Sequence, residues 1–156
     1  DWLDADSYYT ITNKTYAILQ RAHRLSGFDY VFKVDDDSYV NLTMLADELA
    51  NCRAYKHSYI GKKLQSTAPF RDPSHRWYVS PLIYRRTRYP TYAQGHFYGI
   101  SNGILQWLME RGSLNRHIAM EDVAVGLWLE RFRISTKQST SDCITSNRFD
   151  AEKCNN

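Results

Sequence analysis

The stretch Tyr-Val-Phe-Lys-Val-Asp-Asp-Asp, residues 30–37, decides the fold. Its first five residues are aromatic or β-branched apart from one lysine, which is typical of a short β-strand. Three adjacent aspartates follow at once, so they lie at the carboxyl end of the predicted strand, where open α/β sheets bind their ligands. We therefore expect an α/β fold with a functional site around Asp35, Asp36 and Asp37.

Helices are predicted on both sides of this strand. Apolar residues recur every three or four positions between residues 8 and 25 and again between 38 and 52. Gly27 ends the first of these helices, and Ser38 or Asn41 caps the second. Later in the chain, the patterns predict strands at 59–62 and 97–101, an extended segment at 76–80, helices at 102–111 and 121–132, and loops at 66–73 and 84–95.

Length and charge narrow the range of functions. A chain of 156 residues with 43% hydrophobic content is long enough for one compact domain with a core. The net charge of +3 is small and dispersed, which argues against a nucleic-acid surface. One basic cluster, Arg85, Arg86 and Arg88, alternates with tyrosines and suits either the binding of phosphate or an anionic sugar, or a solvated loop.

The aspartate triplet is either a solvated turn or a cation site. An EF-hand is excluded, because Val40 occupies the glycine position of the loop and Ala46 stands where the bidentate glutamate belongs. Three like charges at the end of a buried strand repel one another unless a cation lies among them. Mg²⁺ and Mn²⁺ are bound by one or two carboxylates together with water and substrate phosphates, which suits a nucleotide-sugar donor.

A second pair of acids, Glu121 and Asp122, opens the predicted helix at 121–132. Acids in a first helical turn interact favourably with the helix dipole, so a purely structural role is one reading. An inverting glycosyl transfer also needs a carboxylate that takes the proton of the acceptor hydroxyl, and Asp122 is available for that role.

Aromatic residues form a third candidate element. Trp77 and Tyr78 suit a platform on which a sugar ring stacks, and core packing is the simpler alternative. Gly95, in the loop that follows, permits close approach of the backbone to a ligand.

Cysteines and glycosylation motifs bear on the compartment. Cys143 and Cys154 enclose a short polar loop and are the expected disulfide, which leaves Cys52 at the end of a helix. Asn13 and Asn41 begin N-glycosylation sequons, which are compatible with a secretory compartment. The chain contains no apolar run near the ~20 residues that span a membrane.

Six ordered blocks carry a family resemblance. They are residues 6–15, 33–41, 59–61, 76–80, 89–95 and 121–126. The second resembles the motif Lys-x-Asp-Asp-Asp-x-Phe-Val-Asn, and the last contains Glu-Asp-Val. In this order the blocks resemble the β-1,3-galactosyltransferase and β-1,3-N-acetylglucosaminyltransferase family, glycosyltransferase family 31, to which the fringe proteins are distantly related.

The resemblance implies a GT-A fold and inverting β-1,3 transfer of galactose or N-acetylglucosamine from a UDP-sugar to a glycan or glycoprotein acceptor. It also implies dependence on Mn²⁺, with Mg²⁺ as the substitute, and residence in the Golgi lumen through a membrane segment outside this chain. The site residues that it implies are Asp37 and Asp35 for the metal; Asp35, Asp36 and Lys33 for the donor; Asp122 as catalytic base; and Trp77, Tyr78, Gly95 and Glu121 for the acceptor.

The resemblance also sets the expected boundaries. Residues 1–134 correspond to a GT-A catalytic domain without its first βαβ region, and residues 135–156 to a polar tail. No histidine follows His117, so the late metal-binding histidine of many family members is missing. Two alternatives to the enzyme remain: a non-catalytic carbohydrate- or nucleotide-binding remnant of the same fold, and a structural Ca²⁺-binding module.

Overall fold

A computed structural model describes residues 10–52, 57–110 and 118–133. These residues form a mixed α/β domain, as the sequence predicts. Its elements in chain order are α1 (Ile11–His23), β1 (Tyr30–Val34), α2 (Leu42–Cys52), β2 (Tyr59–Leu64), β3 (Tyr92–Ser101), α3 (Asn102–Glu110) and α4 (Glu121–Arg133).

The described strands form one sheet in the order β1-β3-β2, and the central strand β3 is antiparallel to both neighbours. Tyr30 pairs with Ser101 at one end of β1, and Val34 pairs with Phe97 at the other. The backbone N–H of Asp35 then donates to the carbonyl of His96 at 3.0 Å. The carboxyl end of β1, where the aspartates follow, therefore lies beside the first half of the antiparallel strand β3. In open parallel sheets ligands bind where the carboxyl ends of several strands meet, and that arrangement does not explain the position of these aspartates.

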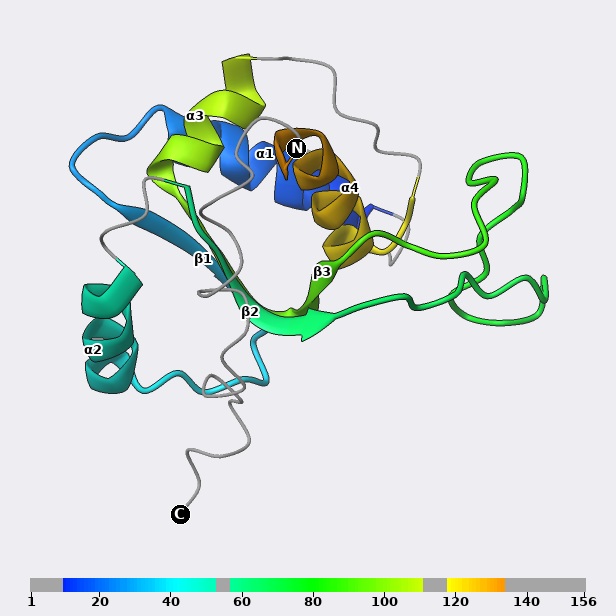
Figure 1. Ribbon diagram of the computed structural model, residues 1–156, viewed down its shortest axis with the longest axis horizontal. Coiled ribbons are helices and arrows are strands. Elements are labelled where there is room, and N and C mark those ends of the chain that lie inside the picture. The colour runs from blue at the N-terminus through cyan, green and yellow to red at the C-terminus, as the bar shows by residue number, and fades with distance from the viewer. Residues whose placement is uncertain (1–9, 53–56, 111–117, 134–156) are drawn as a thin grey trace.

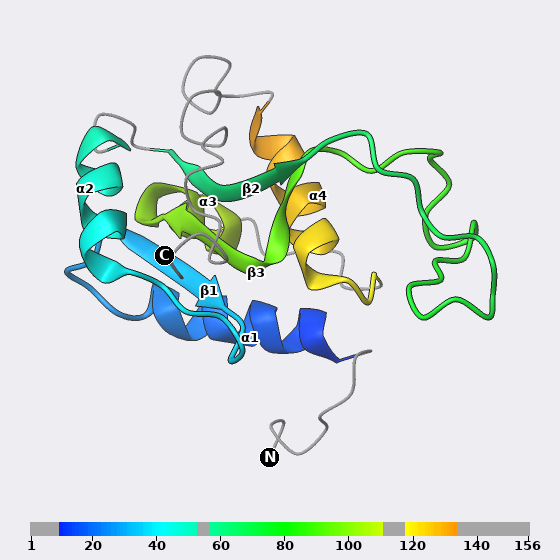
Figure 2. The ribbon, with the colours of Figure 1, turned by 90° about the horizontal axis from the view of Figure 1, so that it is seen from below.

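Helices cover the two faces of the sheet unequally. The three helices α1, α3 and α4 lie together on one face, and α2 lies alone on the other (Figures 1 and 2). The main core forms under the three helices, where side chains such as Ile104, Leu105 and Val125 are at most 1% exposed. On the opposite face, Leu49 of α2 packs near the fully buried Ile60.

Most predicted elements are confirmed with shifted ends. The second helix begins at Leu42, because the Asn41 side chain accepts hydrogen bonds from the backbone N–H groups of Thr43 and Met44, both at 3.1 Å. Arg24, not Gly27, is the residue that caps α1.

Two backbone predictions are wrong. Residues 92–95 belong to β3 and not to a loop, because β2 continues to Leu64, which pairs with Tyr92. Residues 76–80 are not extended throughout, because residues 76–77 form a turn in which the Tyr78 backbone N–H donates to the His75 carbonyl at 2.9 Å. A single parallel bridge joins Tyr78 to Phe70.

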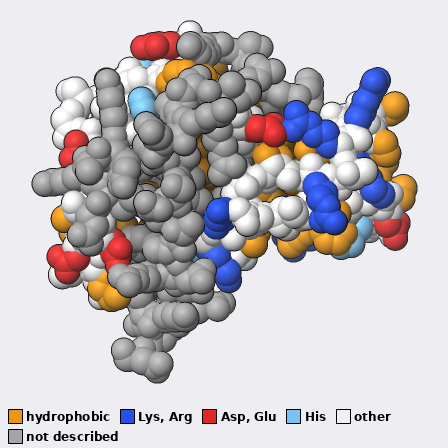
Figure 3. All heavy atoms as spheres, in the orientation of Figure 1, with side chains coloured by type: hydrophobic (Ala, Val, Ile, Leu, Met, Phe, Trp, Pro, Cys, Tyr) orange, Lys and Arg blue, Asp and Glu red, His pale blue; other side chains and the backbone are white. Residues whose placement is uncertain are grey.

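Residues 65–91 connect β2 to β3 and project from the sheet as a long loop (Figures 1 and 2). The space-filling view shows both basic and hydrophobic side chains on this projection (Figure 3). Three of its residues, Val79, Tyr84 and Tyr89, are buried in a second small core together with Ile118, Tyr92 of β3 and Val123 of α4. The projection is therefore packed against the rest of the domain at this core.

Some predictions concern residues outside the described ranges. The tail at 135–156 and the Cys143–Cys154 disulfide belong to this group, as does the boundary at residue 134. Among the described helices, none combines the length and apolar character needed to cross a membrane.

Gly99 gives a test of the sheet packing. A Cβ built at this position would lie 2.3 Å from the Phe32 ring, which itself stacks on Phe97 at 5.5 Å. We expect Gly99→Ala to lower the free energy of unfolding by about 1–3 kcal/mol, because the ring must leave its place. Urea unfolding measures the change.

The matched control is Gly27→Asn, since Gly27 has a φ of +80°, which asparagine tolerates, and no atom within 4 Å of a built Cβ. Its cost should stay within about 0.5 kcal/mol. Equal stability of Gly99→Ala and the natural protein would contradict the packing described for Phe32.

Candidate catalytic site

The Lys33 side chain joins three elements of the fold. Side chains alternate along a strand, so Lys33 projects from the same face of β1 as Val31, which packs in the main core beneath α4. Its ammonium forms an ion pair with Asp35, donates to the carbonyl of Gly95 on β3 at 2.5 Å, and lies 3.1 Å from Glu121 Oε1 on α4.

Lys33 keeps its charge in this position. Burial lowers its pKa, but the Asp35 and Glu121 carboxylates offset that effect and leave the pKa raised. A permanent positive charge therefore lies between the end of β1 and the start of α4.

Asp122 lies in the first turn of α4, next to Glu121. Its Oδ1 accepts a hydrogen bond from the Val123 backbone N–H at 2.7 Å, and the Gly95 backbone contributes a second bond. Burial is the main cause that raises the pKa of Asp122 from 3.8 to about 6, and the neighbouring Glu121 adds to it. At neutral pH Asp122 is therefore a carboxylate with an unusual affinity for a proton, as a general base requires.

The raised pKa of Asp122 also fixes its effect on stability. Between pH 3.8 and about 6 the folded protein holds a proton that the unfolded chain releases. The stabilisation from this group is complete below pH 3.8 and is lost as the pH rises through about 6. At neutral pH the ionised Asp122 is a cost to the fold.

The segment before α4 is held by α1. The Thr12 hydroxyl donates to the Ile118 carbonyl at 2.7 Å and also contacts the Ala119 carbonyl at 3.1 Å. Gly95 of β3 packs against the first turn of α4, because a Cβ at this position would lie 3.1 Å from Glu121 Oε1 and 3.3 Å from Asp122 Oδ2. Glycine thus allows β3 to approach the two acids closely.

The other two aspartates face solvent. Asp36 and Asp37 are exposed in the turn after β1, where the Ser38 backbone N–H donates to the Asp35 carbonyl at 3.1 Å. Within the described ranges, no group of three His, Cys, Asp or Glu side chains could hold a metal alone. The donor set is carboxylate oxygen only, which fits a hard cation that completes its shell with water and a diphosphate.

Trp77 and Tyr78 lie near the same helix start. They line a small pocket of about 80 Å³ together with Ala119 and Met120, the two residues before Glu121. Trp77 is half-buried, Tyr78 is exposed, and the Arg76 guanidinium lies 5.4 Å from the Trp77 ring. The pocket therefore lies against the segment that leads into α4, and Met120 is its lining residue nearest in sequence to the two acids.

The basic cluster of the loop has structural partners. Arg86 Nη1 lies 2.7 and 2.8 Å from the two carboxylate oxygens of Glu130 on α4, and Arg88 donates to the Ser66 carbonyl. These contacts support the structural interpretation of the cluster over the anion-binding one.

The site thus brings together the predicted residues Lys33, Asp35, Gly95, Glu121 and Asp122 in direct contact. Sequence reasoning missed Arg71, which donates to three backbone carbonyls of the projecting loop. A single arginine between two prolines carries no periodic or motif signal that could have indicated this role.

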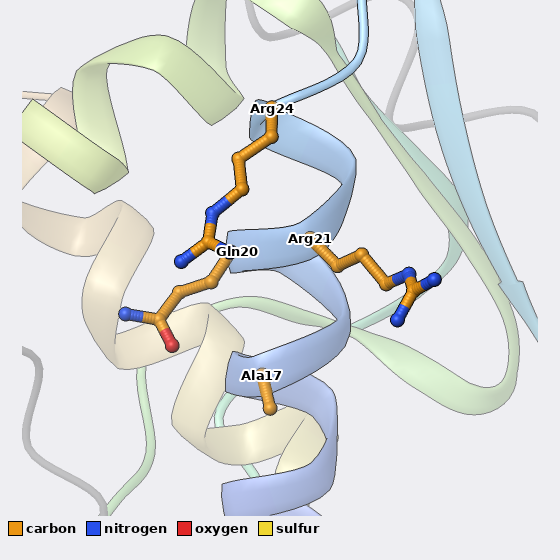
Figure 4. A pocket seen from close by; sticks show the side chains of 4 residues that line it. All are labelled: Ala17, Gln20, Arg21 and Arg24. Atoms are coloured by element: carbon orange, nitrogen blue, oxygen red, sulfur yellow. The ribbon is translucent and has the colours of Figure 1, made fainter.

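A separate groove of about 230 Å³ lies on α1, lined by Ala17, Gln20, Arg21 and Arg24. Figure 4 shows Gln20 and Arg24 pointing to one side of the helix and Arg21 to the other. These lining residues include no carboxylate or nucleophile, so the groove shares none of the chemistry of the acid cluster.

Comparison with known proteins confirms the resemblance read from the six blocks. Residues 4–140 match the profile of a family described as Galactosyltransferase. The chain is 33% identical over 147 residues to hydroxyproline O-galactosyltransferase GALT6 of Arabidopsis thaliana, covering 92% of this chain and 21% of that protein.

Two human relatives match comparably. Beta-1,3-galactosyltransferase 5 is 30% identical over 139 residues, which are 88% of this chain and 44% of the relative. Beta-1,3-galactosyltransferase 2 is 31% identical over 132 residues, which are 83% and 31% respectively. The chain therefore spans between about a fifth and under a half of the length of these relatives.

Replacement of Lys33 tests the electrostatic arrangement. Lys33→Met keeps an unbranched side chain of nearly the same length but leaves Asp35 and Glu121 without their shared cation. We expect the free energy of unfolding at pH 7.5 to fall by about 1–3 kcal/mol, since partial exposure weakens the pairs. Urea unfolding at pH 7.5 measures the loss.

The double variant Lys33→Met/Glu121→Gln provides the control. Removing the negative charge of Glu121 should recover part of the lost stability, as expected for coupled residues. A loss of stability in the double variant that equals the sum of the losses in the two single variants would show that Lys33 and Glu121 do not interact.

Proposed function

Since the chain belongs to the galactosyltransferase family, we propose that it is the catalytic part of an inverting β-1,3-glycosyltransferase. The donor is a UDP-hexose, either UDP-galactose or UDP-N-acetylglucosamine, and the acceptor is a glycan or glycoprotein. The observation that carries this proposal is the buried Asp122 carboxylate, whose pKa is raised to about 6 and which is joined through Gly95 and Lys33 to the end of β1.

Asp122 acts as the general base. It takes the proton of the acceptor hydroxyl while that oxygen forms a bond to the anomeric carbon of the donor sugar. The bond from that carbon to UDP breaks on the opposite face, so the configuration inverts. Glu121, paired with Lys33, stays beside Asp122 and contributes to its raised pKa.

The end of β1 binds the donor. Asp35, Asp36 and Lys33 would contact the nucleotide sugar, and the carboxylates of Asp37 and Asp35 would hold Mn²⁺ or Mg²⁺. When bound, such an ion stabilises the negative charge that develops on the departing diphosphate. The exposure of Asp36 and Asp37 supports this role, because an incoming diphosphate can reach them.

The acceptor enters beside the start of α4. Trp77 and Tyr78 offer aromatic faces to a sugar ring, and their pocket lies against Ala119 and Met120. Gly95 and Glu121 are the other residues assigned to the acceptor side, since the lack of a side chain at Gly95 lets β3 approach Glu121 and Asp122 closely.

The proposal extends to fold and location. A GT-A arrangement and residence in the Golgi lumen as a type II membrane protein are features that the family membership supports. The activity proposed is that of the whole protein, because the chain covers only part of its relatives.

Release of UDP tests the proposal. The full-length protein is incubated with Mn²⁺, UDP-galactose or UDP-N-acetylglucosamine, and the methyl β-glycoside of N-acetylglucosamine or galactose. We expect transfer that falls at least about 10³-fold in Asp122→Asn, because the base is lost, and about 10²-fold in Asp37→Asn, because the metal is held less well.

Asp122→Asn should unfold at a higher temperature than the natural protein at pH 7.5, since it removes a buried charge. Loss of activity through unfolding is thereby separated from loss of the base. Full activity in both variants would overturn the site assignment, and tight UDP binding without turnover would favour a non-catalytic remnant.

A further inference from the structure

The Arg71 side chain donates hydrogen bonds to three backbone carbonyls of the projecting loop of residues 65–91. Its Nη1 donates to the Val79 carbonyl at 2.6 Å. Its Nη2 donates to the Tyr84 carbonyl at 2.7 Å and to the Arg86 carbonyl at 2.9 Å. One guanidinium therefore gathers three backbone positions that lie 8 to 15 residues away along the chain.

Only arginine supplies this arrangement. A guanidinium is planar, is always charged at physiological pH and carries five donors in a fixed fork, whereas a lysine ammonium is a compact charge on a flexible stem. Charge-assisted hydrogen bonds of this kind are stronger than neutral ones. Arg71 is thus suited to fix several carbonyls of an irregular loop at once.

The first of these carbonyls belongs to Val79, a residue of the small pocket. Val79 lines the small pocket together with Trp77, Tyr78, Ala119 and Met120. Its backbone N–H donates to the Phe70 carbonyl at 2.9 Å, so Val79 is bonded on both sides by the segment that carries Arg71.

The same loop is fastened to α4. Val79, Tyr84 and Tyr89 pack with Ile118 and Val123 in the second core, and Val123 directly follows Asp122. Towards the other end of α4, the Arg86 guanidinium contacts both carboxylate oxygens of Glu130. The backbone carbonyl of Arg86 accepts a hydrogen bond from Arg71. Arg71 therefore links the backbone at Val79 to Tyr84 and Arg86, two loop residues that are themselves in contact with α4 or with residues packed on it.

We propose that Arg71 is a positioning residue that holds the Trp77 and Tyr78 wall of the pocket at a fixed place relative to Asp122, and so determines acceptor binding. This inference rests on the proposed glycosyl transfer. Arg71 touches neither acid, so it acts through the loop backbone: without its three bonds the Val79 carbonyl is released and the pocket loses its shape.

Steady-state kinetics of Arg71→Ala and Arg71→Lys in the full-length protein test the proposal. With UDP-galactose and methyl β-N-acetylglucosaminide, or whichever of the four donor and acceptor pairs is used by the natural protein, the acceptor KM should rise about tenfold in both variants. The donor KM should stay within about twofold, because the loop does not reach the end of β1. Arg71→Lys should fail to rescue, since lysine cannot bond three carbonyls in one plane.

Hydrogen exchange supplies a readout that does not depend on activity. The amides of Val79 and Tyr89, bonded to the Phe70 and Thr67 carbonyls, should exchange about tenfold faster in both variants. The amides of β1 and β3 should be unaffected. Arg24→Ala, which alters the exposed side chain of the residue directly after α1, is the control and should change neither exchange nor KM.

The failures are distinguishable. Turnover by the natural protein with an unchanged acceptor KM in Arg71→Ala overturns the role of Arg71 and leaves the proposed function intact. A fall in kcat and in global stability together with a rise in both KM values also overturns the positioning role, because Arg71 would then be a general structural residue. A natural protein that transfers no sugar from either donor overturns the proposed function itself.

Discussion

The contact between the Lys33 ammonium and its partners on three elements is the constraint on which the site depends. Two carboxylates and a backbone carbonyl converge on it, from the end of β1, from β3 and from the first turn of α4. A charged side chain in this half-buried position is tolerated only with such partners. Their convergence brings the aspartate triplet and the acid pair of α4 into one site.

The second constraint is the absence of a side chain at Gly95. Contact of β3 with both Glu121 and Asp122 leaves the latter buried, and burial raises its pKa toward neutrality. The charge of Lys33 lowers the pKa of Asp122, but this effect is smaller than that of burial. The Lys33 ammonium is ion-paired with Glu121 at 3.1 Å. Two adjacent acids thus have different surroundings: one belongs to an ion pair, and the other is suited to accept a proton.

Local signals made much of this predictable. The apolar run before Asp35 indicated a strand, helical spacing indicated α1 to α4, and two acids in a first turn indicated the start of α4. Topology was not predictable: the pairing of Val34 with Phe97 and the bond from Lys33 to Gly95, 62 residues away, depend on long-range packing. Arg71 and the extension of β3 to Tyr92 have the same cause, since each depends on contacts that no local pattern encodes.

The measurement that tests this account most directly is the titration of the Asp122 side-chain carboxyl by ¹³C NMR, assigned by comparison with Asp122→Asn. The account predicts a midpoint of about 6, because burial against β3 and the neighbouring Glu121 both disfavour the ionised form. A midpoint near the ordinary value of 3.8 would show that the carboxyl is well solvated. Asp122 would then not be the buried base on which the proposed transfer depends.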